Sequence, residues 1–160
     1  MSTRCRIEIK AGEYVYRIYR HSDGYPQGVI ADLYIFMNNY SRSPGGDPEY
    51  FLANFIFYAK LAHWVEALRD GKFDSSLKWW EYGYGVCAPN CDHGDLDYAY
   101  TIEGQNVEIR KYLWATKDWS LIFSGTIEEA YKKFCANTPY ADGCHMPEGL
   151  FAVQKLLATV

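Results

Sequence analysis

Two alternating segments near the start of the chain limit its possible folds more than any other feature. In residues 4–10 apolar and charged side chains alternate, which is the pattern of a strand with one buried face. Residues 11–13 suit a tight turn, and residues 14–20 are rich in amino acids that favour strands. The sequence therefore predicts a β-hairpin over residues 4–20.

Helical and strand patterns follow the hairpin in blocks. Asp47 is the expected N-cap of one helix and Thr126 of another, and Gly71 is the expected end of the first. We expect helices over residues 29–40, 48–70, 126–134 and 147–158, and strands over residues 82–86, 96–103, 106–114 and 119–124. Strands joined by tight turns pair antiparallel, so the sequence predicts an α+β fold. We expect a single domain over residues 1–160, with an antiparallel sheet of about five or six strands packed against two or more helices.

Composition indicates the cellular location of the protein and the class of partner that it could bind. No run of 18 apolar residues is present, so we expect no transmembrane helix. The first residues lack the apolar stretch of a signal peptide, which predicts a cytoplasmic protein with reduced cysteines or cysteines that bind metal. A net charge of −4 disfavours nucleic acid as a partner, although arginines gather in the first twenty residues. The aromatic fraction of 18% favours a surface that binds a partner.

Residues 20–28 join the second strand to the first helix and contain the densest group of reactive side chains. Arg20, His21 and Asp23 are candidate catalytic residues, because an imidazole near a carboxylate can transfer protons and a guanidinium can hold a phosphate. The same stretch also suits a turn, since Asp23 can bond its own backbone and Pro26 restricts the residue before it. We favour the turn, which leaves Arg20 and His21 as the residues to examine for function.

The opening Met-Ser-Thr-Arg-Cys-Arg-Ile and the later Tyr-Arg-His-Ser-Asp-Gly-Tyr-Pro-Gln-Gly-Val resemble a group of small proteins encoded by bacteriophages and prokaryotes. Chains of that group begin Ser-Thr-Arg and continue into a strand that ends in Tyr-x-His-x-Asp-Gly-Tyr-Pro. The resemblance covers about the first 40 residues and is weaker around residues 82–84. It implies a phage-linked or mobile-element origin, and a phage-encoded chain is expected in the host cytoplasm. The group has no assigned activity, so the resemblance supplies no catalytic residue.

The cysteines form a candidate zinc site. Cys87, Cys91 and His93 lie in one expected loop, and Cys135 and Cys144 lie in a second one. Thiolate and imidazole are the ligands that zinc prefers, and four protein ligands would make the site structural. The spacing differs from the usual Cys-x2-Cys, so thiols packed as small apolar groups, or a disulfide within either loop, remain alternatives. Zinc is the one cofactor that the sequence suggests.

We expect an accessory protein that binds a macromolecular partner of the host, through an aromatic-rich surface. A protein partner is favoured over nucleic acid, and no membrane is expected. The expected binding residues are Tyr19, Tyr25, Tyr82 and Tyr84. The five tryptophans, Trp64, Trp79, Trp80, Trp114 and Trp119, could stack on nucleic-acid bases, but we favour core packing as their role. The alternative is a small enzyme that acts on a phosphoester or nucleotide, with Arg20, His21 and Asp23 in its pocket. Of the two, we favour the binding protein. The sequence carries no signal for an oligomeric state.

Overall fold

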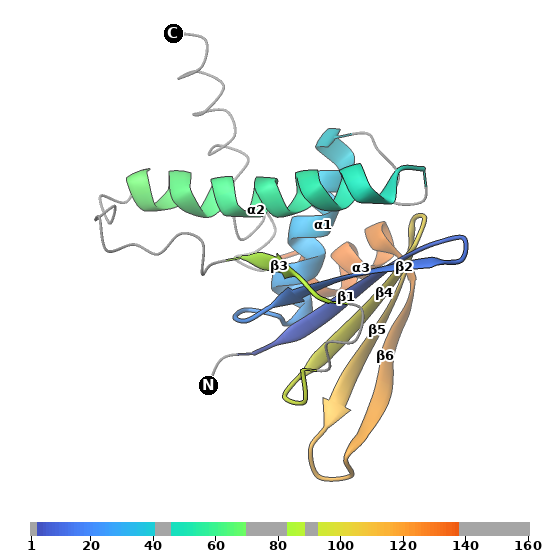
Figure 1. Cartoon of the computed structure of the whole chain (residues 1–160). Coiled ribbons are helices and arrows are strands. Elements are labelled where there is room, and N and C mark those ends of the chain that lie inside the picture. The colour runs from blue at the N-terminus through green and yellow to red at the C-terminus, as the bar shows by residue number, and fades with distance from the viewer. Residues whose placement is uncertain (1–2, 41–45, 70–82, 89–92, 138–160) are drawn as a thin grey trace, which may run out of the picture.

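The computed structural model describes residues 3–40, 46–69, 83–88 and 93–137, which form one sheet and three helices (Figure 1). In chain order the elements are β1 (Cys5–Ala11), β2 (Tyr14–Arg20), α1 (Pro26–Tyr40), α2 (Pro48–Arg69), β3 (Tyr84–Val86), β4 (Tyr98–Glu103), β5 (Asn106–Leu113), β6 (Asp118–Thr126) and α3 (Ile127–Phe134). The predicted hairpin of β1 and β2 and the later hairpins of β4 to β6 are confirmed. The helix predicted over residues 147–158 lies outside the described residues.

The six strands are arranged in the order β3-β2-β1-β4-β5-β6. The α+β class is confirmed, but the sheet is mixed rather than wholly antiparallel, because β1 and β4 pair in parallel. The reason is the path of the chain between β3 and β4. After pairing with the outer side of β2, the chain crosses both β2 and β1 before it re-enters the sheet. Tight turns predict only pairs that are adjacent in sequence, so this long-range pair was not predicted.

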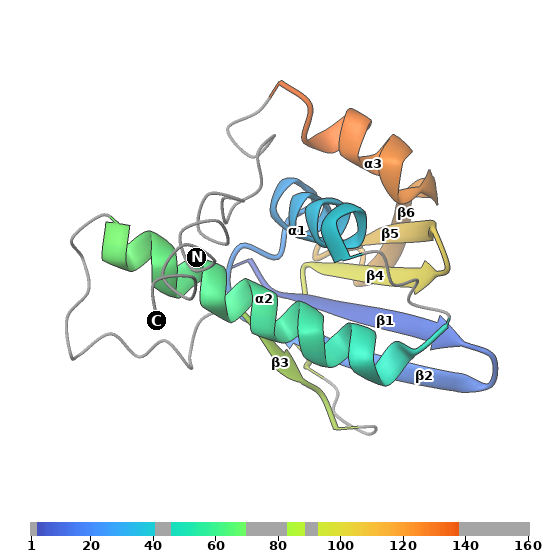
Figure 2. The same ribbon diagram turned by 90° about the horizontal axis from the view of Figure 1, so that it is seen from above.

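All three helices lie on one side of the sheet (Figures 1 and 2). The alternation in β1 decides which side is covered, since Cys5, Ile7 and Ile9 are fully buried beneath the helices. Aromatic side chains fill the space between α1 and α2, where Phe36 contacts Phe51 with the ring centroids 5.2 Å apart. The opposite face of the sheet carries the polar half of each strand, and no helix among the described residues packs against it.

The boundary between β6 and α3 is set by local hydrogen bonds. Thr126 is the N-cap, as predicted, and its hydroxyl accepts from the Glu129 backbone N–H at 3.2 Å. The Glu129 carboxylate accepts in return from the Thr126 backbone N–H at 2.8 Å, which completes a capping box. α1 begins at Pro26, earlier than expected, because proline is well suited to the first turn of a helix.

The capping box leads to a prediction about stability in acid. Hydrogen bonds from the backbone N–H and then the hydroxyl of Thr126 lower the pKa of Glu129. A lowered folded-state pKa stabilises the fold above the unfolded-state pKa, and this stability is lost as the pH falls through the folded-state value. We expect wild type to lose more stability than Glu129→Gln between about pH 6 and about pH 3, measured by urea denaturation.

The control is Glu103→Gln, which removes an exposed carboxylate at the end of β4. This control should follow wild type across the whole range of pH. A Glu129→Gln variant with the same acid sensitivity as wild type would contradict the role assigned to the capping box. Thr126→Ala should lower the free energy of unfolding by about 1 kcal/mol at neutral pH.

Candidate functional site

The three predicted catalytic residues point to different sides of the sheet. Successive side chains of a strand alternate, so Arg20 faces the helices whereas Tyr19 faces away from them. His21 follows Tyr19, and its Nδ1 lies 3.1 Å from the Tyr19 hydroxyl. Asp23 is exposed and has a φ of 56°, as expected for the turn that we favoured. The structure therefore does not bring Arg20, His21 and Asp23 into one pocket.

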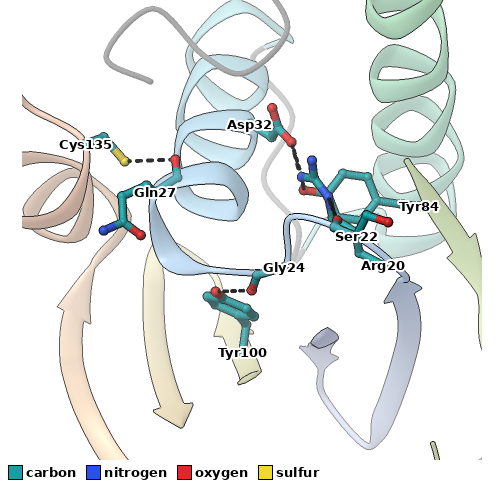
Figure 3. A network of polar contacts seen from close by, with 8 residues as sticks. All are labelled: Arg20, Ser22, Gly24, Gln27, Asp32, Tyr84, Tyr100 and Cys135. Carbon is teal, nitrogen blue, oxygen red and sulfur yellow. Dashed lines mark hydrogen bonds and ion pairs between the residues drawn. The ribbon is translucent and has the colours of Figure 1, made fainter. Parts of the chain in front are cut away.

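Arg20 belongs instead to a buried polar network with Asp32 and Tyr84 (Figure 3). The Arg20 Nη1 donates to Asp32 Oδ2 and to the Tyr84 hydroxyl, both at 2.6 Å. The Tyr84 hydroxyl donates to the same Oδ2 at 2.9 Å, and the Arg20 Nε donates to the Ser22 carbonyl at 2.7 Å. The side chains of Arg20 and Asp32 are 2% and 0% exposed. This network connects β2, α1 and β3 inside the protein.

Asp32 is the member of the network that the sequence analysis missed. It is the only charged residue between Pro26 and Met37, in a helix that is otherwise largely apolar. A lone carboxylate in such surroundings needs a buried partner, and this signal was available in the sequence. Its Oδ1 points away from Arg20 (Figure 3) and has no hydrogen-bond partner among the described residues. Burial raises the pKa of Tyr84 well above its usual value, so its phenol stays a neutral donor.

We expect Arg20→Met to destabilise the fold strongly, because it leaves the Asp32 carboxylate buried without its cation. Loss of one member of a buried ion pair costs about 3–5 kcal/mol. The control is Arg110→Met, which removes an exposed arginine that pairs with Glu108 at 3.4 Å and should cost less than about 1 kcal/mol. Urea denaturation measures both. A loss below about 1 kcal/mol for Arg20→Met would show that the network does not support the fold.

The face of the sheet opposite the helices holds a second group of side chains. Strand register places one transverse row of residues on this outer face, namely Tyr19, Arg6, Ala99, Arg110 and Leu121. Tyr112 and Trp119 form the next pair towards the β5–β6 turn, with their ring centroids 5.2 Å apart. Trp114 packs edge-on against Tyr112 at 4.7 Å and donates its Nε1 proton to Asp97. Aromatic side chains thus gather at one end of the outer face.

The connection from β3 to β4 adds a histidine to this end of the sheet. His93 stacks on the ring of Tyr19, with the centroids 3.8 Å apart and the planes 13° from parallel. Because His21 contacts the hydroxyl of Tyr19, the tyrosine has a histidine at its face and another at its edge. We call Tyr19, His93, Tyr112, Trp114 and Trp119 the aromatic face. Nothing in the sequence spacing indicated that His93 would meet Tyr19, since the contact depends on the crossover path.

Three residues of the aromatic face, His93, Tyr112 and Trp119, border a hollow of about 220 Å³. The hollow is lined by Arg6, His93, Gly94, Leu96, Tyr112 and Trp119. Arg6 is the one arginine or lysine among these lining residues, and its side chain is 25% exposed. The residues around the hollow include three aromatic rings, one leucine and one guanidinium group, and the surface that they present to the hollow is more polar than apolar. This hollow and the aromatic face form the candidate functional site.

The predicted binding tyrosines divide between the surface and the interior. Tyr19 belongs to the aromatic face, as described above. Tyr84 is 1% exposed and belongs to the buried network, so the structure places it away from any surface. Tyr25 is half-buried, and its carbonyl accepts from Gly28 and Val29 at the start of α1. Tyr82 lies outside the described residues.

The predicted zinc ligands that the structure describes lie in different parts of the fold. Cys87 follows β3 at one edge of the sheet, where its backbone N–H donates to the backbone carbonyl of Arg17. Cys135 ends α3, and its thiol donates to the Gln27 carbonyl in α1 at 3.5 Å. Among the described residues, no group of three or more His, Cys, Asp and Glu side chains is arranged to hold a metal ion. Cys91 and Cys144 lie outside the described residues, so the zinc site stays a prediction.

The buried cysteines provide a test of this environment. Burial raises the pKa of Cys5 and of Cys135 to about 12, so neither forms the reactive thiolate at neutral pH. We expect both thiols to resist alkylation in the native protein at about pH 8 and to react once the protein is unfolded in urea. Mass spectrometry of the labelled peptides separates the two positions. Labelling of either cysteine at equal rates in the native and unfolded protein would contradict the assigned burial.

Comparisons with known proteins add no relative. No protein-family model, no curated protein and no solved structure matches the chain. Within the described part of the chain, no helix has the length and apolar character needed to span a membrane.

Proposed function

We propose that this is a binding protein that recognises a protein partner through the aromatic face, and that the partner belongs to the host of a phage. The observation that carries the proposal is the hollow on the outer face, where aromatic side chains surround one arginine. The likeness of the first residues to phage-encoded proteins supports a host partner. Small proteins of that origin often act by binding a host component.

The residue types of the aromatic face support a protein partner. Tyrosine, tryptophan and arginine are enriched where protein interfaces concentrate their binding energy, because they bury a large area around a polar group. Trp114 is 55% exposed, although its indole nitrogen is bonded to Asp97. Leu121 is also largely exposed on the same face. Exposed apolar area of this kind is stabilised when a partner covers it.

The charges of the outer face favour protein over nucleic acid. Arg17 and Arg6 lie beside Glu8, and Arg110 lies beside Glu108, so positive and negative side chains are interspersed. Binding to a phosphate backbone depends on a surplus of Lys and Arg over one face, which this arrangement does not provide.

The alternative of an enzyme acting on a nucleotide has no comparable support. Sites that enclose ligands of drug size occupy about 300–1,000 Å³. The hollow of about 220 Å³ is smaller than that range and suits a single side chain of a partner. The residues predicted for catalysis also do not converge, since Arg20 is occupied inside the protein. The binding protein is therefore the function that we propose.

The proposal predicts which variants lose the partner. The partner is first captured from host lysate by the immobilised wild-type protein, identified, and purified. We expect Trp119→Ala and Trp114→Ala each to weaken its binding by about 30-fold, the effect of losing a residue worth about 2 kcal/mol at an interface. Titration calorimetry with the purified partner measures the change in Kd.

The matched control is Tyr50→Ala, which removes an exposed aromatic side chain from α2, on the helical side of the sheet. It should bind the partner as wild type does. Thermal unfolding verifies that each variant keeps its fold. If the tryptophan variants keep full affinity, or if Tyr50→Ala loses as much as they do, the aromatic face is not the binding surface.

A further inference from the structure

Arg6 brings to the hollow a guanidinium group that shares its carboxylate partner with a second arginine. Its Nε is buried and makes no hydrogen bond within the described residues. Within the described residues, the carboxylate paired with it is Glu8, whose Oε1 lies 3.4 Å from that Nε. The same oxygen accepts a hydrogen bond from Arg17 Nε at 2.8 Å. Glu8 is therefore shared, and its better contact is with Arg17.

The other charged groups nearby have hydrogen-bond or ion-pair partners of their own. Arg4 is paired with Asp95. Asp97 accepts from the Arg4 backbone N–H at 3.0 Å and from the Trp114 indole at 3.1 Å, which engages both of its oxygens. Arg6 and Arg17 share the single carboxylate of Glu8, so Arg6 has no carboxylate to itself within the described residues. The guanidinium of Arg6 has donors left for an incoming acceptor.

We propose that the hollow is a subsite for one carboxylate, supplied by an Asp or Glu side chain of the protein partner, and that Arg6 is its ligand. This inference rests on the proposed function and names the group that the partner inserts. A guanidinium binds a carboxylate through two parallel hydrogen bonds, and these strengthen when the surroundings exclude water. The aromatic walls from Tyr112 and Trp119 provide that exclusion once a partner covers them.

A singly charged acceptor fits this subsite better than a phosphate group. Proteins that bind phosphorylated motifs use clusters of arginines, because the ligand carries nearly two negative charges. Here one arginine lines the hollow, and Glu8 beside it would repel a second negative charge. The aromatic rings around Arg6 also favour a carboxylate attached to an apolar or aromatic group, which can pack against them.

The test uses benzoate as a probe and benzamide as its uncharged counterpart of the same shape. The indole N–H signal of Trp119 is followed by NMR while each compound is titrated into the whole protein. We expect benzoate to shift the signal to saturation and benzamide to bind at least about tenfold more weakly. Arg6→Gln should weaken benzoate binding by at least about tenfold, and Arg6→Lys should restore part of it.

Two further variants separate a role in binding from a role in the fold. Glu8→Gln removes the competing carboxylate while Arg6 stays in place, so it should tighten benzoate binding several-fold. Arg110→Gln lies two strands away in the same transverse row, is not among the lining residues and should bind benzoate as wild type does. The subsite is rejected if benzamide binds as well as benzoate, if Glu8→Gln binds more weakly than wild type, or if inorganic phosphate binds more tightly than benzoate.

The same variants distinguish this inference from the proposed function. Loss of the partner in Trp119→Ala with full affinity in Arg6→Gln would keep the aromatic face and reject the carboxylate subsite. The opposite result is also informative. If benzoate binding depends on Arg6 but neither Trp114→Ala nor Trp119→Ala changes the affinity for the partner, the subsite is kept. The aromatic face is then rejected as the partner's binding surface.

Discussion

The buried contact of Arg20 with Asp32 and Tyr84 is the interaction on which the arrangement of the fold depends. An arginine that is almost fully buried costs much free energy unless its charge is matched, and Asp32 supplies the match from α1. Tyr84 brings the short strand β3 to the same place. With only three residues, β3 pairs with β2 through few backbone contacts, so this side-chain network anchors it. The start of the crossover to β4 is thereby held at the edge of the sheet.

The crossover in turn builds the outer site. The chain leaves β3 beyond β2 and rejoins the sheet beside β1, and the contact of His93 with Tyr19 places the end of this connection on the outer face. His93 reaches Tyr19, and Leu96 is buried beside the hollow. Ala99 lies between Arg6 and Arg110 in the transverse row. The buried network of Arg20 and the outer hollow are therefore linked through the backbone of the connection from β3 to β4.

The sequence predicted the parts of this structure that depend on neighbouring residues. Alternation defined β1 and β2, and the local hydrogen bonds of Thr126 defined the start of α3. The parallel pairing of β1 with β4 was not predicted, because it depends on a path through space rather than on a turn. Arg20 was assigned to a possible pocket, although the alternation that buries Ile18 also directs Arg20 inward. The hollow itself was beyond prediction, since its walls come from segments brought together only by that path.

The alternation in β2 also separates stability from recognition. Arg20 points inward to a network that supports the fold, whereas Tyr19 points outward to the aromatic face. Side chains on opposite faces of a strand contact different neighbours, so substitutions on the two faces should act independently. Under the proposed function, the outer residues could change to suit a different partner without loss of the fold. Under the same proposal, this separation would let the residues around the hollow vary while the buried ion pair holds β2, α1 and β3 together.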